Sequence, residues 1–204
     1  YGPSWILLTV IPYVLSFNNI IASIFSFKIL ISTFYVGMIW LIRKLSRDLS
    51  SVALFALSPL VLIETLVSAH NDVVMMFFAL LSFYLLKQKQ IILACIALLF
   101  SILIKYATIL LVPVFLFVVY RKLQKKEVDW EKVYAVSALS MLFALFSAPL
   151  REEIYSWYII WPLSFAVLIT KRKFILFLIL VLSFSTLLRY VPVLHTGNYF
   201  GSTP

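Results

Sequence analysis

Residues 58–81 read SPLVLIETLVSAHNDVVMMFFALL, a stretch that is apolar apart from a few polar side chains, three of them ionisable: Glu64, His70 and Asp72. An ionised side chain at the centre of a bilayer costs about 2.5–3.5 kcal/mol. Ionisable residues within membrane segments therefore usually face a bundle interior or a polar cavity, where they serve function. The stretch predicts one membrane helix that ends near His70 and a second that begins near Asp72.

The composition of the whole chain predicts a polytopic membrane protein. Of its 204 residues, 64% are hydrophobic and 12% are charged, against about 25% charged in a soluble domain. The net charge of +9 does not indicate nucleic acid, because the basic residues lie in short loops rather than on a polar surface with interleaved aromatics. The lone Cys95 excludes a disulfide framework.

Apolar segments follow one another along the chain and predict an all-α transmembrane helix bundle. They lie at about 5–17, 20–42, 49–69, 73–86, 91–104, 106–120, 133–150, 154–170 and 174–188. Several are shorter than the roughly 20 residues that cross a bilayer. The run 91–120 has Lys105 at its middle, so two short helices meeting there are favoured over one tilted helix.

We expect a single transmembrane domain over 1–204. It has an outer interfacial segment at 1–19, about eight membrane segments within 20–190 and an outward tail at 191–204. An ordinary crossing helix is the alternative for the first segment. The opening YGPSW predicts the C-terminal part of a longer chain.

The loops alternate in charge. Most of the 17 Lys and Arg lie at 43–48, 87–90, 121–132 and 170–173, and the positive-inside rule makes these loops cytoplasmic. The alternate turns, at 70–72, 105–106, 150–158 and 189–200, then face outward. The prediction is a multi-pass plasma-membrane protein with its reactive groups outside the cytoplasm.

The outward turns supply the candidate site residues. In the first turn a carboxylate of Glu64 or Asp72 could accept a proton from a hydroxyl group, while His70 and Asp72 could orient a phosphate or hold a divalent cation. Alternatively, Asn71 or Asp72 caps the next helix and Glu64 pairs with a Lys. Lys105 is a candidate phosphate-binding cation, with a snorkelling or ion-paired Lys as the alternative.

Two further outward groups follow. Tyr155, Trp157, Tyr158 and Trp161 predict either an interfacial aromatic belt or a platform for a sugar or an isoprenoid. Arg151 precedes Glu152 and Glu153 and could simply pair with them in solvent. Arg189, Tyr190 and His195 form the last cluster, in which Arg189 is a phosphate candidate.

Four stretches occur in an order that resembles a known superfamily. They are YGPSWILL, SPLVLIETLVSAHNDVVMMFFALL, LLFSILIKYATILLVPVFLF and REEIYSWYIIWPLSFAVL. Together they resemble the GT-C membrane glycosyltransferases, and most of all the bacterial polyprenyl-phosphate-mannose-dependent mannosyltransferases. The resemblance implies transfer of a sugar, mannose by this likeness, from a lipid-phosphate donor to a glycan or glycolipid acceptor by an inverting displacement.

The resemblance also implies roles for particular residues. It places the principal catalytic acid upstream of Tyr1 and leaves Asp72 and Glu64 as candidates within the chain. The donor phosphate would be bound by His70, Asn71, Asp72, Lys105, Tyr106 and Arg189, and the acceptor or sugar platform would be formed by Tyr155, Trp157, Tyr158 and Glu152. We expect no metal site and no cofactor, although a divalent cation stays open. The alternatives are a transporter or flippase of lipid-linked sugars and a non-catalytic membrane subunit.

Overall fold

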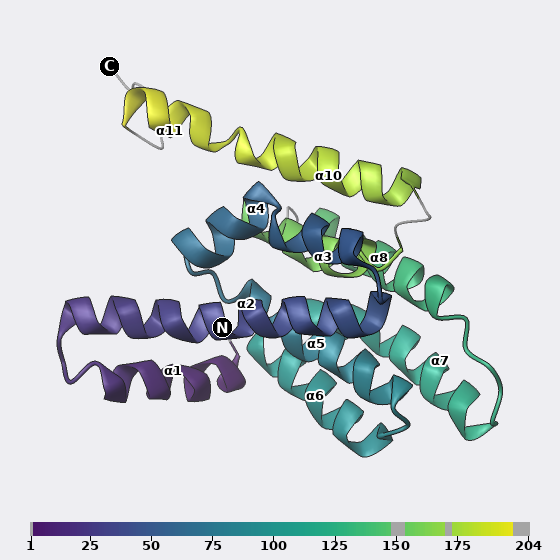
Figure 1. Cartoon of the computed structure of the whole chain (residues 1–204). Helices are drawn as coiled ribbons and strands as arrows, with labels where there is room; N and C mark the ends of the chain where they lie inside the picture. Colours follow the sequence, from purple (N-terminus) through teal and green to yellow (C-terminus); the bar gives the residue numbers. More distant parts are fainter. Residues whose placement is uncertain (1, 148–153, 170–172, 198–204) are drawn as a thin grey trace.

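The computed structural model describes residues 2–147, 154–169 and 173–197, and these residues form an all-helical structure. The predicted all-α class is confirmed. The elements, in chain order, are α1 (Pro3–Leu15), α2 (Ile20–Ser46), α3 (Leu49–Ala56), α4 (Pro59–Val61), η1 (Leu62–Val67), α5 (Asp72–Lys87), α6 (Ile91–Ile104), η2 (Tyr106–Leu111), α7 (Val112–Leu123), α8 (Trp130–Ser147), η4 (Ser156–Ile159), α9 (Ile160–Ala166), α10 (Lys173–Leu187) and α11 (Tyr190–Thr196). In Figure 1, α10 and α11 run along the edge of the structure beyond α3 and α4.

Two of the described helices are long and apolar enough to cross a membrane, Ile20–Ser46 and Tyr106–Leu123. A third candidate span is the pair Leu49–Ala56 and Pro59–Val67, which is bent by 49°. Two to three candidate spans are therefore present where about eight membrane segments were expected. The described part of the expected segment 154–170, residues 154–169, contributes a 3₁₀ turn and the seven-residue α9. At 1.5 Å per residue α9 is about 10 Å long, and it is buried.

The broken span between α2 and α5 has local causes. Arg47 adopts a left-handed conformation (φ 57°) and ends α2, and the Asp48 side chain then caps α3 by accepting from the Ser50 backbone N–H at 3.0 Å. Pro59 cannot continue the preceding helix because it lacks an N–H, so the chain bends there and restarts as α4. The next turn is the π-helix η1, a rare geometry that is frequent at functional sites and that carries Glu64.

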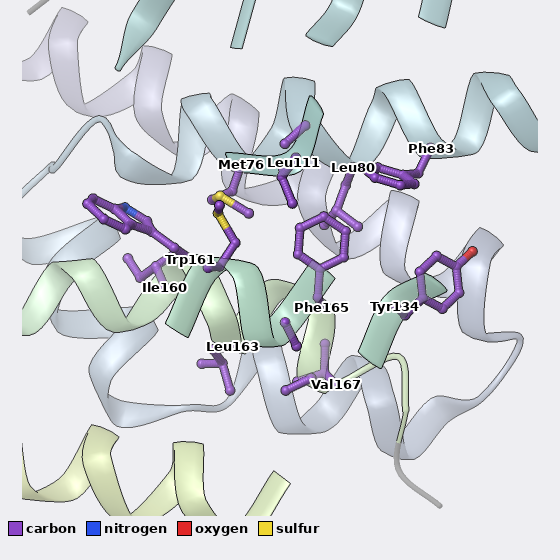
Figure 2. Packing of buried hydrophobic residues seen from close by; sticks show 14 of the residues in the cluster. Met76, Leu80, Phe83, Leu111, Tyr134, Ile160, Trp161, Leu163, Phe165 and Val167 are labelled. Carbon is purple, nitrogen blue, oxygen red and sulfur yellow. The ribbon is translucent and has the colours of Figure 1, made fainter. Parts of the chain in front are cut away.

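The core of the bundle is built around α5, which packs against α2, α6 and α9. Figure 2 shows Met76, Leu80 and Phe83 of α5 facing the buried side chains of α9. The Phe83 and Phe165 rings lie edge to face with centroids 5.4 Å apart. Close approach of α2 requires Gly37, because a Cβ there would lie 2.6 Å from the Phe77 ring.

Helix α1 packs against α2 and α6. Its start is fixed by Gly2, whose N–H donates to the Ile104 carbonyl at 3.0 Å. A Cβ at this position would lie 2.1 Å from the Leu103 carbonyl oxygen, so only glycine permits the contact. The interfacial placement of residues 1–19 stays a prediction.

Candidate active site

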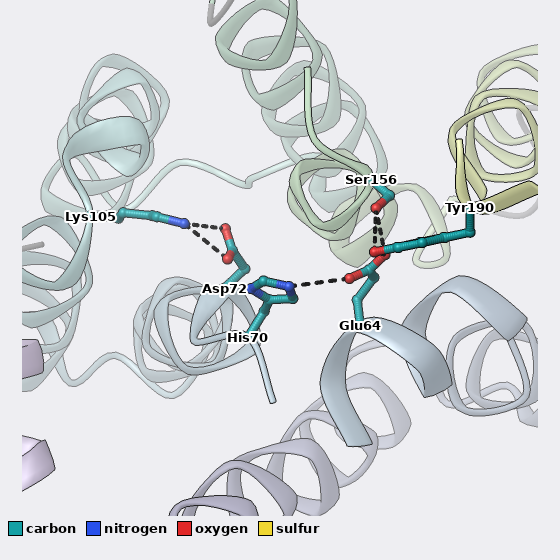
Figure 3. Close-up of polar contacts among 6 residues, drawn as sticks. All are labelled: Glu64, His70, Asp72, Lys105, Ser156 and Tyr190. Carbon is teal, nitrogen blue, oxygen red and sulfur yellow. Dashed lines mark hydrogen bonds and ion pairs between the residues drawn. The ribbon is translucent and has the colours of Figure 1, made fainter. Parts of the chain in front are cut away.

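Two buried carboxylates define the candidate site. Glu64 and Asp72 are both fully buried and stand on either side of the turn that carries His70. Figure 3 shows that each carboxylate has its own set of polar neighbours, contributed by segments far away in the chain. An unpaired buried charge is costly, so these neighbours explain how the bundle accommodates both acids.

Asp72 is held by an ion pair and a hydrogen bond. It is the first residue of α5, where the positive end of the helix dipole favours a carboxylate. The Lys105 ammonium lies 2.9 Å from both of its oxygens, and the Trp161 indole N–H donates to Oδ1 at 2.6 Å. Lys105 also lies 5.2 Å from the centre of the Tyr158 ring and 5.8 Å from that of Trp161. Two aromatic rings therefore lie within cation–π distance of the ammonium group.

Lys105 stands at a backbone break between two helices. Helix α6 ends at Ile104, Lys105 is extended (φ −151°, ψ 127°), and η2 begins at Tyr106. The prediction of two short helices meeting at this lysine is confirmed. The side chain of Lys105 retains 21% exposure while its partner carboxylate has none.

Glu64 is held by hydroxyl groups rather than by the lysine partner considered for it. Its Oε1 accepts hydrogen bonds from the Ser156 hydroxyl and, at 2.8 Å, from the Tyr190 hydroxyl. Its Oε2 is buried and has no hydrogen-bond partner, and His70 Nε2 lies 3.4 Å from it. One oxygen of this carboxylate is therefore anchored, while the other faces a titratable ring.

His70 lies beside the Glu64 carboxylate and stacks on the aromatic segment. Its side chain is partly exposed and stacks on Trp157 with centroids 3.8 Å apart. Burial lowers the pKa of His70 below its usual 6.5; Asp72 and Glu64 raise it and Lys105 lowers it, but burial dominates. At neutral pH the imidazole is therefore mostly uncharged and one ring nitrogen can accept a proton.

The aromatic segment 155–161 joins both groups. Ser156 contacts Glu64, and Trp161 contacts Asp72. Trp157 stacks on Tyr155 with centroids 4.4 Å apart as well as on His70, so the two rings must occupy opposite faces of the indole. Arg189 lies 5.0 Å from the Tyr155 ring and donates to the Ile154 carbonyl at 2.9 Å. The result is a stacked column from Arg189 to His70.

The structure brings together most, but not all, of the predicted site residues. Glu64, His70, Asp72, Lys105, Tyr155, Trp157, Tyr158 and Arg189 all belong to the arrangement above. The alternative that Asn71 or Asp72 caps α5 is wrong, because no side-chain cap is formed, and the Asn71 amide nitrogen is buried without a partner. Tyr106 and His195 point to exposed surfaces, and Glu152 lies outside the described residues.

Ser156 was missed by the sequence analysis, and Tyr190 was noted only as a neighbour of Arg189. A serine among aromatic residues carries no signal of its own. Within residues 2–147, 154–169 and 173–197, no three His, Cys, Asp or Glu side chains gather in a way that could hold a metal ion.

A comparison with known families assigns the chain. Residues 1–121 match the model of the MptA/B family, described as "Alpha-(1->6)-mannopyranosyltransferase, N-terminal domain". This match covers more than half of the chain, which therefore belongs to this family of membrane mannosyltransferases that depend on polyprenyl-phosphate mannose. No curated protein and no solved structure matches.

The family confirms the predicted class of enzyme, a hexosyltransferase, and implies a mannose donor and a glycan acceptor. The matched region contains Glu64, His70, Asp72 and Lys105. The segment 155–161 and Tyr190, which complete the site, lie beyond it.

Proposed function

We propose that this chain transfers mannose from a polyprenyl-phosphate donor to a glycan or glycolipid acceptor on the extracytoplasmic face of the plasma membrane, at the site formed by Glu64 and Asp72. The observation that carries the proposal is a pair of buried carboxylates. One lies beside a lysine and the other beside a neutral histidine, and both accept hydrogen bonds from the aromatic segment 155–161. Transfer of a glycosyl group needs a cation for the departing phosphate and a base for the acceptor.

The Asp72 side of the site would bind the donor phosphate. Lys105 is a compact point charge of the kind that binds phosphate, and its remaining exposure leaves it within reach of a ligand. Asn71, which precedes Asp72 in the chain, has a buried amide nitrogen that could donate a further hydrogen bond. Asp72 would hold Lys105 in place, and Tyr106 and Arg189 would complete the binding of the headgroup.

The Glu64 side would activate the acceptor. In the displacement, the bond between mannose C1 and the phosphate oxygen breaks, the acceptor oxygen bonds to C1, and the acceptor proton passes to the His70–Glu64 pair. The hydroxyls of Ser156 and Tyr190 fix the carboxylate through Oε1, which leaves Oε2 to stabilise the imidazolium that forms. The acceptor would rest against the edges of Tyr155, Trp157 and Tyr158, and against Glu152, because the ring faces of Trp157 are filled by its neighbours.

The membrane arrangement proposed with this function has the basic loops in the cytoplasm and about eight crossings or half-crossings, of which 154–169 is a half-crossing buried among other helices. The site would then lie where lipid-linked sugars, rather than nucleotide sugars, supply mannose. The short helices α1, α6 and α10 would accompany the candidate spans around a groove open to lipid.

The test is mannose transfer in membranes that contain the protein, with polyprenyl-phosphate mannose or a nucleotide-linked mannose as donor. Lys105→Met should lower transfer from the lipid donor by about 100-fold, the size of effect seen when one stabilising donor is removed from a transition state. Lys132→Met, which removes an exposed lysine, is the matched control and should leave transfer unchanged. Transfer from the nucleotide donor alone, or full activity in Lys105→Met, would contradict the proposal.

A further inference from the structure

Two buried hydroxyl groups flank the backbone break at Lys105. Ser101 lies on the last turn of α6, Thr108 lies in η2, and both residues are fully buried. Their hydroxyl oxygens are 3.1 Å apart. We propose that this pair of hydroxyls positions the Lys105 ammonium for the donor phosphate, an inference that rests on the proposed function.

The hydroxyl pair connects the break to α5. The Ser101 hydroxyl donates to the Met75 carbonyl at 2.8 Å, and Met75 follows Asp72 by three residues, about one helical turn. The Thr108 hydroxyl donates to the Lys105 carbonyl at 3.4 Å. A short chain of contacts therefore runs from the first turn of α5, which begins with Asp72, to the main chain of Lys105.

The backbone on both sides of the break is anchored by groups from outside α6. A helix end leaves carbonyl groups without partners in the helix, and a buried carbonyl without a partner is costly. The Ile104 carbonyl accepts from the Gly2 N–H at 3.0 Å, and the next carbonyl, that of Lys105, accepts from Thr108. These two contacts fix the extended residue between them, and with it the direction in which the Lys105 side chain leaves the backbone.

The position of Lys105 matters because its ammonium serves Asp72 and, in the proposed reaction, the donor phosphate. In Figure 3 the Lys105 side chain extends toward the Asp72 carboxylate, and its ammonium lies 2.9 Å from both oxygens. A misplacement of about 1 Å in a reacting site can lower the rate about 100-fold. Ser101 and Thr108 are buried and do not reach the donor, so they are positioning residues that act through Lys105.

Steady-state kinetics of mannose transfer from polyprenyl-phosphate mannose tests the proposal at matched protein levels. Thr108→Val keeps the shape of the side chain and removes its hydroxyl, and should lower kcat/KM for the donor about tenfold. Thr108→Ser, which keeps a hydroxyl, should recover most of this loss. The matched control is Ser82→Ala, because Ser82 is equally buried but donates to the Ala79 carbonyl of its own helix; it should leave kcat/KM unchanged.

A double variant separates positioning from a general loss of structure. Because Thr108 acts through Lys105, Thr108→Val should cause no further decrease in kcat/KM when it is added to Lys105→Met. Ser101→Ala breaks the same link from the α6 side and should behave alike, so the test does not depend on the folding of one variant.

Three results would overturn the positioning role. They are parental kcat/KM in both Thr108→Val and Ser101→Ala, equal losses in Thr108→Val and Thr108→Ser, and a full further loss in the Lys105→Met background. Failure of the unmodified protein to transfer mannose, or full activity in Lys105→Met, would instead overturn the proposed function.

Discussion

Replacing Asp72 by Asn removes the charge that balances Lys105 while retaining an oxygen that can accept the Trp161 N–H. Breaking a buried ion pair by removing one partner costs about 3–5 kcal/mol. Because Lys105 is 21% exposed, water compensates part of the loss, and we expect a decrease of about 3 kcal/mol in the free energy of unfolding. Lys105→Met should cost about as much, since it leaves the carboxylate buried and unpaired.

The double variant Asp72→Asn/Lys105→Met decides whether the pair is coupled. It contains no unpaired charge, so its loss of stability should fall short of the sum of the single losses by about 2 kcal/mol. The assay is denaturant-induced unfolding in detergent micelles, with Trp161→Phe as a control that keeps both charges. Additive losses, within about 0.5 kcal/mol, would refute the assignment of the buried ion pair.

Three other predictions concern the second carboxylate, the histidine and the helix packing. Glu64→Gln should lower transfer about 100-fold with little change in protein level, and full transfer by this variant would exclude Glu64 from catalysis. Tyr190→Phe should lower the free energy of unfolding by about 1.5 kcal/mol, because a charge-assisted hydrogen bond is lost. The lowered pKa of His70 means that the unfolded state binds this proton more tightly, so protonation favours unfolding. The contribution of His70 to stability is fully present above the usual pKa of 6.5. It is lost as pH falls from there towards the lower pKa of the folded state. Denaturation measured across this window should show a weaker pH dependence in His70→Gln, and an identical dependence would contradict the assignment. Gly37→Val should force the Phe77 ring to move and lower the free energy of unfolding by about 1–3 kcal/mol. An unchanged midpoint of denaturant-induced unfolding would show that α2 and α5 can separate without loss of stability.

The sequence predicted the parts of the site that depend on local patterns. An acid in an apolar run, a turn of three polar residues and a lysine in the middle of an apolar stretch each stand out against their surroundings, and the break at Lys105 follows from the cost of placing that lysine in lipid. The all-helical class follows from hydropathy alone.

The rest of the site depends on contacts that local patterns do not contain. Ser156 and Tyr190 reach Glu64 across 92 and 126 residues of chain, and the π-helical turn that aims Glu64 has no signature in the periodicity of its residues. The segment 154–170 was expected to be another membrane segment because buried and lipid-facing helices are equally apolar. The structure instead shows the short α9 enclosed between α5 and α8.

In the proposed reaction the Asp72 group binds the donor phosphate and the Glu64 group activates the acceptor. Steady-state kinetics of mannose transfer from polyprenyl-phosphate mannose, measured with Lys105→Met and Glu64→Gln at matched protein levels, tests it most directly. Lys105→Met should lower kcat/KM for the donor about 100-fold, while Glu64→Gln should mainly lower kcat and leave the KM for the donor nearly unchanged. Parental values of both constants in both variants would contradict it.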